Sequence, residues 1–551
     1  MAPVIRNTLV TVILLISVPH PGHAAGEETL PSFHWSYPLL DQLRLRGYFT
    51  SLFISNRPFT RGAIAAELRR VRSDIDTDRR QPSQAEQGLL DLLAAEFRPE
   101  LDELSGAVAP NRLKLGLIGT LDAASRPHAL ERSDLVYYGI NPMSGGTKAR
   151  EAIRSTVSVG LGDHLALYHS LRADRNLKDD PAYIGKPFRG FNAYTEQAYV
   201  QGTFRPVHFT LGRDFLVLGS GKSGNLLLSD NSRTFDQYRV DLTASFVRFT
   251  AFGIALDDVP LDTVIVRGQG PVNTARRFIN GHRLDFRLAQ WGSIGVSEVI
   301  IYGGPRRTFE LAFINPVNFY HGEQLNDESL GRTGSELASL DIDLFPVPRL
   351  ELFGELLIDD VKIERVNTSD LEPSKVGLLI GAQYADPFGL DGVSVRAEYV
   401  RVANRTYNTL FNEWERFVHR NRPIGYFLGN NVDRLDLTAS GWAGRTVFVS
   451  GSYEYTRQGR DNITSPYNTD YLNVPSVDAG YTEPFPFGPV QRTHALNLGA
   501  RYVPSVDVQF RVDVRLAHVT DFGFAPGVVK NQVQLFRAGV FINFNRIVGW
   551  E

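Results

Sequence analysis

Residues 212–230 (GRDFLVLGSGKSGNLLLSD) include the spacing that most suggests chemistry. Gly219, Gly221 and Gly224 form G-x-G-x-x-G, a pattern that can cradle the phosphates of a nucleotide. A dinucleotide site also needs a strand before this pattern and a helix after it, whereas here another alternating strand follows. A Walker loop would need its first glycine at position 216, which is Leu216. We therefore expect no nucleotide, and interpret the glycines as residues that let a long loop turn tightly.

Other catalytic or metal-binding patterns are weak. The 12 histidines show neither H-x-x-x-H nor H-E-x-x-H spacing, so we expect no metal site. Asp257-Asp258 and Asp359-Asp360 could serve as paired glycosidase carboxylates, but each pair lies at a strand end or in a loop, where solvated turn residues are commoner. No G-x-S-x-G elbow is present. The sequence thus predicts neither an enzyme nor a cofactor.

Aromatic and basic side chains are dense in two long connecting segments, 403–431 and 457–491. Aromatic rings can stack on sugars, and arginine can pair bidentately with the carboxylates of acidic polysaccharides. The alternative is that these side chains pack the loops together or form an interfacial girdle. The candidate polysaccharide-binding residues are Arg405, Tyr407, Trp414, Arg416, Tyr467 and Tyr471.

The N-terminus resembles a secretory signal. Arg6 provides a positive charge, Leu9–Val18 is an apolar run too short to span a bilayer, and Gly22-His23-Ala24 suits cleavage. We expect residues 1–24 to be a signal peptide. The 58 basic and 61 acidic side chains nearly balance, so no nucleic-acid partner is expected. The absence of cysteine excludes disulfides, thiolate metal sites and a lipid-modified N-terminal cysteine.

Residues 26–110 show helical periodicity. Helices are expected from Ser36 to Arg46, from Thr60 onward, and after Ser83, which forms a capping-box pattern with Glu86. The interpretation is a small, packed helical bundle of about three helices.

From about Arg112 the apolar period changes to two. In Val506–Ala517, alternate positions are apolar and the others are mostly charged. Strands of about ten residues with this pattern favour a membrane barrel over a soluble sandwich, whose strands are usually shorter. The predicted strands are 112–122, 153–161, 164–173, 193–204, 207–216, 235–244, 246–256, 279–289, 293–302, 335–345, 348–359, 374–385, 391–402, 432–442, 445–456, 492–503, 506–519 and 531–543.

The fold class is therefore a mainly β, transmembrane antiparallel barrel of about 18 strands, spanning 111–551. Tight links such as 205–206 alternate with long ones such as 217–234. With an even strand count, both termini and the helical bundle are expected on the periplasmic side. The long loops then face outward, and the glycine loop is expected to fold back into the barrel mouth. The penultimate position of Trp550 is less typical, because many such barrels end on an aromatic residue.

The segment GRDFLVLGSGKSGNLLLSDNSRTFD resembles the glycine-rich region of the Wzi-type capsule assembly family. NGHRLDFRLAQWGSIGVSEVIIYGG, ELAFINPVNFYHGEQ and GYFLGNNVDRLDL follow in the family's order. The resemblance implies a lectin-like, non-enzymatic barrel in the outer membrane of a Gram-negative bacterium, which holds capsular polysaccharide or exopolysaccharide. Outer-membrane lipid is the expected surrounding partner, and a monomer is expected. A passive or sugar-selective porin is the alternative, and an enzyme barrel ranks third.

Overall fold

Alternation of side chains builds the barrel wall. On the strand Leu350–Asp360, the side chains of Leu352, Leu356 and Ile358 are exposed on the outer surface, while those of Glu351 and Glu355 are buried inside. Successive side chains of a strand point to opposite faces, so one strand presents apolar side chains outward and carboxylates to the lumen. The computed structural model describes residues 27–106, 111–126, 146–162, 164–175, 177, 183, 185–266, 270–322, 334–362 and 365–550.

Nineteen strands form one antiparallel sheet, of which eighteen close into a barrel because β2 pairs with both β3 and β23. The barrel strands are β2 (Asn111–Arg126), β3 (Gly146–Leu161), β4 (Leu165–Asp174), β5 (Asn192–Phe204), β6 (Val207–Asp214), β8 (Phe235–Ala244), β9 (Val247–Ala255), β11 (Gly270–Arg287), β12 (Gly292–Pro305), β13 (Ser335–Val347), β14 (Leu350–Asp360), β15 (Lys375–Ala385), β16 (Val393–Val402), β19 (Val432–Ala443), β20 (Val447–Gly459), β21 (Val490–Ser505), β22 (Val508–Thr520) and β23 (Val529–Trp550). The nineteenth strand, β10 (Val259–Val266), pairs with the outer half of β11. The predicted fold class is confirmed.

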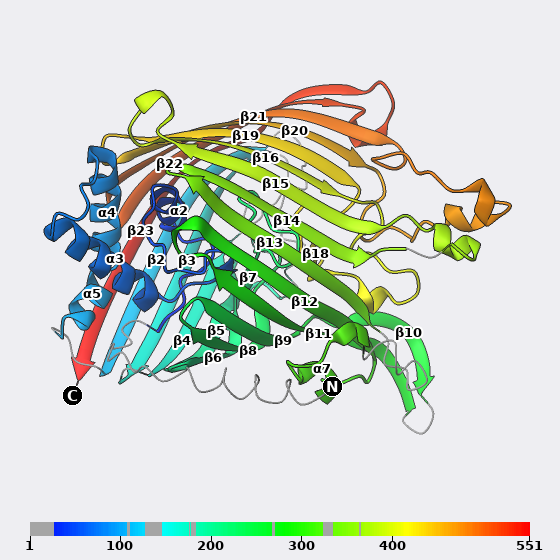
Figure 1. Ribbon diagram of the computed structural model, residues 1–551, viewed down its shortest axis with the longest axis horizontal. Coiled ribbons are helices and arrows are strands. Elements are labelled where there is room, and N and C mark those ends of the chain that lie inside the picture. The colour runs from blue at the N-terminus through cyan, green and yellow to red at the C-terminus, as the bar shows by residue number, and fades with distance from the viewer. Residues whose placement is uncertain are drawn as a thin grey trace, which may run out of the picture.

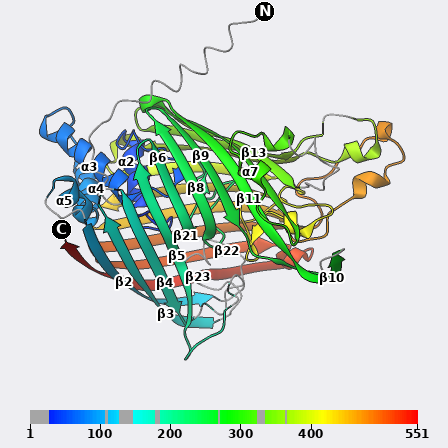
Figure 2. The ribbon, with the colours of Figure 1, turned by 90° about the horizontal axis from the view of Figure 1, so that it is seen from below.

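The two ends of the barrel differ. Short links such as 205–206 and 348–349 lie at the end that carries the helices and the C-terminus, and the long loops extend from the other end (Figures 1 and 2). The long loops contain α7 (Leu311–Ile314), β17 (Val418–His419), which pairs with β18 (Arg422–Pro423), and the short 3-10 turns η4 (Thr368–Leu371), η6 (Glu413–Glu415), η7 (Asp470–Asn473), η8 (Val477–Ala479) and η9 (Phe522–Phe524). The short turns η2 (Ala289–Trp291) and η5 (Pro387–Gly389) lie at the helical end.

In the described part of the chain, four helices precede the barrel: α2 (Tyr37–Leu45), α3 (Arg61–Asp76), α4 (Gln84–Glu96) and α5 (Arg98–Leu104). Three are the expected ones, and the Ser83–Glu86 capping box forms as the sequence indicates. The fourth, α5, was not expected. Among the described residues, no helix is both long and apolar enough to cross a membrane. The helices share one apolar core with Trp442 of β19 and Val503 of β21, so they pack directly on the barrel end.

The N-terminal segment (residues 27–60) contacts the barrel wall on several sides. Asn56 donates to Asp285 at 2.8 Å, and Arg46 pairs with Asp386 at 2.7 Å. In the same segment, β1 (Asn56–Arg57) pairs with β7 (Val217–Leu218), which directly precedes the glycine-rich segment. Two segments that are far apart in sequence thus meet inside the barrel.

Candidate functional site

The glycine-rich segment, here called the inward loop (residues 219–230), is bound to carboxylates of the barrel wall. Glu355 accepts hydrogen bonds from the amides of Gly221 and Leu226, each at 2.6 Å. Glu398 accepts from the Lys222 amide at 2.8 Å, and the Lys222 ammonium lies 2.8 Å from Glu351. Amides that could cradle a phosphate are therefore already occupied by wall carboxylates. The expected return of the loop into the barrel is confirmed.

The glycines of the inward loop permit this close packing. Gly219 and Gly224 adopt φ values of +135° and +148°, which side chains disfavour. At Gly221, an added Cβ would lie 2.2 Å from the carbonyl oxygen of Gly224. The G-x-G-x-x-G spacing therefore reflects backbone geometry.

Apolar side chains of the inward loop fill part of the lumen. Leu226, Leu227 and Leu228 are buried in one cluster with wall residues such as Ile279 and Leu379. The 403–431 loop contributes further members to the same cluster, namely Tyr407, Phe417, Ile424 and Tyr426. Two loops from the long-loop end thus form an apolar core within the barrel.

Three of the predicted sugar-binding residues lie together in the outer loops. The Arg405 guanidinium sits 6.0 Å from the Tyr467 ring centre and 5.4 Å from that of Tyr471. Arg405 also pairs with Glu483 at 2.7 Å and donates to the carbonyl of Asn468. Arg405 and Tyr471 are buried, and Tyr467 is half-buried. This cluster joins the 403–431 and 457–491 loops.

The other three lie elsewhere in the same loop layer. Tyr407 is buried, stacks on Phe417 with ring centres 5.7 Å apart, and donates to the carbonyl of Leu226 in the inward loop. Trp414 and Arg416 are half-buried, and their carbonyls accept from Arg277 of β11. The Arg416 side chain lies 3.3 Å from Glu413. A role of these six residues in sugar binding stays a prediction.

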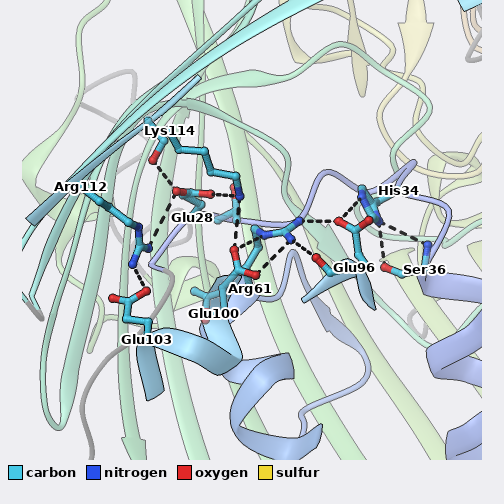
Figure 3. Close-up of polar contacts among 12 residues, drawn as sticks. Glu28, His34, Ser36, Arg61, Glu96, Glu100, Glu103, Arg112 and Lys114 are labelled. Carbon is cyan, nitrogen blue, oxygen red and sulfur yellow. Dashed lines mark hydrogen bonds and ion pairs between the residues drawn. The ribbon is translucent and has the colours of Figure 1, made fainter. Parts of the chain in front are cut away.

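An ion cluster joins the helices to β2 (Figure 3). Arg61 binds Glu96 and Glu100 at 3.0 and 2.7 Å, and Lys114 of β2 lies 3.3 Å from Glu100. Burial acts to raise the pKa of Glu96, but nearby His34 and Arg61 outweigh it and lower that pKa to about 2. We call Arg61, Glu96, Glu100, Lys114 and Glu28, which also binds Lys114, the helix–barrel ion cluster.

A cavity of about 540 Å³ lies between the N-terminal segment, the inward loop and the wall strands β2, β3, β22 and β23. Arg154, Gln509, Arg511, Arg537 and Phe541 are among its lining residues. No local sequence pattern predicts this cavity, because its lining comes from strands at both ends of the chain. One sequence feature does indicate it: Arg501, Arg511 and Arg537 lie on strands where they alternate with apolar residues, and all three line the cavity.

Comparison with known proteins identifies the family. The family model described as capsule assembly protein Wzi matches residues 142–531. This chain belongs to the Wzi capsule assembly family. The resemblance noted in the sequence is thereby confirmed, and as a Wzi-family member the chain is an outer-membrane barrel of a Gram-negative bacterium. No curated protein sequence matches the chain.

Among solved structures, the Wzi-family chain is similar to Wzi of Escherichia coli, which is described as an outer-membrane, carbohydrate-binding β-barrel involved in group 1 capsule assembly. The TM-score is 0.59 at 15% identity, covering 94% of this chain and 100% of the other. Two Pseudomonas aeruginosa proteins are more distant. OccD3 (OpdP) has a TM-score of 0.44 at 11% identity, covering 79% of this chain and 91% of that one. OprD has a TM-score of 0.41 at 10% identity, covering 80% and 94%.

Proposed function

We propose that this protein binds capsular or other surface polysaccharide at the outer face of the outer membrane and retains it there, without catalysing a reaction. Family membership supports capsule assembly, and the similar Escherichia coli barrel is described as carbohydrate-binding. The observation that carries the proposal is the apolar core that the inward loop and the 403–431 loop form inside the lumen. Because these loops fill part of the lumen, the outer loop layer forms a closed surface on which a polysaccharide can be held, in place of an open channel.

The same proposal fixes how the barrel is oriented in the outer membrane. Residues 1–24 act as a signal peptide, and the helices of 26–110 lie in the periplasm beneath the barrel. The loops 403–431 and 457–491 then face the cell exterior. Outer-membrane lipid surrounds the apolar wall, and the protein acts as a monomer.

The polysaccharide contacts the outer loop layer. Trp414 and Arg416 are the best placed of the predicted residues, since both are half-buried and thus partly accessible. The buried Arg405, Tyr407 and Tyr471, with Tyr467, support these loops from beneath through the contacts described above.

A double substitution, Trp414→Ala with Arg416→Ala, tests these contacts by measuring polysaccharide retained on intact cells. We expect affinity to fall by roughly 1–2 kcal/mol, a factor of about 5 to 30. The loss should be partial because a polymer makes many weak contacts whose avidity multiplies. The matched control is Trp291→Ala with Arg205→Ala, a tryptophan and an arginine exposed at the helical end.

Unchanged retention at normal protein levels would show that Trp414 and Arg416 only pack the loops. Loss of the protein itself would show that they hold the loops together, which would also contradict a binding role for these two residues.

A further inference from the structure

The lumenal cavity has the size of a small-molecule site. Its volume of about 540 Å³ lies within the range of roughly 300–1,000 Å³ that is usual for ligand pockets. Among its described lining residues, eight arginines and Lys222 outnumber four carboxylates. The inward loop lines part of the cavity together with Arg422 and Phe427 of the 403–431 loop, whereas Trp414 and Arg416 are not among its lining residues.

Positive charge is concentrated where β21, β22 and β23 run side by side. Arg501 of β21 stands directly opposite Arg511 of β22, and like charges in this position destabilise a sheet. One carboxylate, Asp513, accepts hydrogen bonds from both Arg511 and Arg537, at 2.9 and 2.6 Å. Guanidiniums from three adjacent strands thus line the cavity, and Asp513 pairs with two of them, those of Arg511 and Arg537. An anion in the cavity would stabilise this concentration of positive charge.

Two neutral side chains beside these arginines have unused hydrogen-bonding atoms. Gln509 is 6% exposed, and its Nε2 donor has no partner among the residues that the structure describes. The Oδ1 acceptor of Asn543 is likewise without a partner in the described part of the chain. Both residues line the cavity with the ring of Phe541. Buried polar atoms in proteins are usually hydrogen-bonded, so these atoms point to a ligand with hydroxyl groups.

We propose that this cavity binds a carboxylate-bearing sugar unit. A carboxylate can accept paired N–H bonds from the planar guanidiniums of Arg501 and Arg511. A sugar hydroxyl can accept from Gln509 Nε2, and another can donate to Asn543 Oδ1. The Phe541 ring offers an apolar face to the sugar ring. Inorganic phosphate would satisfy the arginines but would leave the carbon face of Phe541 uncovered.

Calorimetric titration of the purified full-length barrel with glucuronate, glucose and inorganic phosphate tests the proposal. We expect saturable binding of glucuronate that is at least tenfold tighter than that of either other probe. Arg501→Gln should weaken it by roughly tenfold or more, the loss typical of one charge-assisted hydrogen bond. Arg492→Gln is the matched control: it removes an arginine from the same strand, one that pairs with Asp521 and lies outside the cavity lining.

Heat-modifiable gel mobility establishes that each variant is assembled. Gln509→Leu is a second variant, with no change of charge, and should also weaken glucuronate binding. The proposal is overturned if the assembled wild-type protein does not bind glucuronate, or if glucose or phosphate binds equally well. Equal losses in Arg492→Gln and Arg501→Gln would overturn it too. Glucuronate titration of Arg501→Gln reports on the cavity, whereas polysaccharide retained by the Trp414 and Arg416 double variant reports on the outer loops, so failure of one is distinguishable from failure of the other.

Discussion

Gly221 shows how a single residue ties the inward loop to the wall. Its amide donates to Glu355, and an added Cβ would collide with the carbonyl oxygen of Gly224. We expect Gly221→Ala to lower the free energy of unfolding of the lumenal core by about 1–3 kcal/mol, the usual cost of overpacking. Gly119→Ala is the control, because nothing lies within 4 Å of its added Cβ. Chemical denaturation measures both, and equal stabilities would contradict this account of the glycine.

The structural role of these glycines was predictable from the sequence, but which loop aromatics are buried was not. Tyr407 and Trp414 look alike in the sequence, yet Tyr407 is buried against the inward loop and Trp414 is half-buried near β11. Which loop residue is buried depends on contacts with segments nearly two hundred residues away, and no local pattern records these contacts.

The elements that meet at the helical end are held by the helix–barrel ion cluster, whose strength depends on pH. Burial raises the pKa of Glu100, but Arg61 and Lys114 outweigh it and lower that pKa, and Glu96 is lowered from 4.5 to about 2. A carboxylate with a lowered folded-state pKa stabilises the fold above its unfolded value and loses this effect as pH falls. We expect the melting temperature of the helical circular-dichroism signal to fall as pH drops from about 4.5 to 2.

Arg61→Gln should weaken helix docking already at neutral pH, because it leaves Glu96 and Glu100 without their shared partner. Arg98→Gln is the control, since its guanidinium is exposed and lies 3.8 Å from Asp102. A melting temperature that is independent of pH in the wild-type protein would argue against the cluster as the link between helices and barrel.

The regular elements were largely predictable, since each of the eighteen predicted strands overlaps one barrel strand. The apolar side of a lipid-facing strand repeats every second residue, and this period is visible locally. Two of the elements that were not predicted have local explanations. Strand β10 contains Pro260 and, among the described residues, pairs with one strand, the outer half of β11. Helix α5 starts at Arg98-Pro99 directly after α4, where proline reads as a helix end.

For the whole molecule, the filled lumen predicts low ion conductance. Planar-bilayer recordings of the wild-type protein should show no large, steady open currents, because the inward loop and the 403–431 loop share an apolar core inside the barrel. Replacing residues 220–228 by a short Gly-Ser link should open a pathway and raise the conductance. Large wild-type currents would favour the porin alternative.

Titration of the purified full-length protein with purified capsular polysaccharide from its host measures whether this Wzi-family barrel binds surface polysaccharide. We expect saturable binding that is weakened by the Trp414→Ala and Arg416→Ala double substitution and unchanged by the Trp291→Ala and Arg205→Ala control. Absence of saturable binding by the assembled wild-type barrel would contradict it.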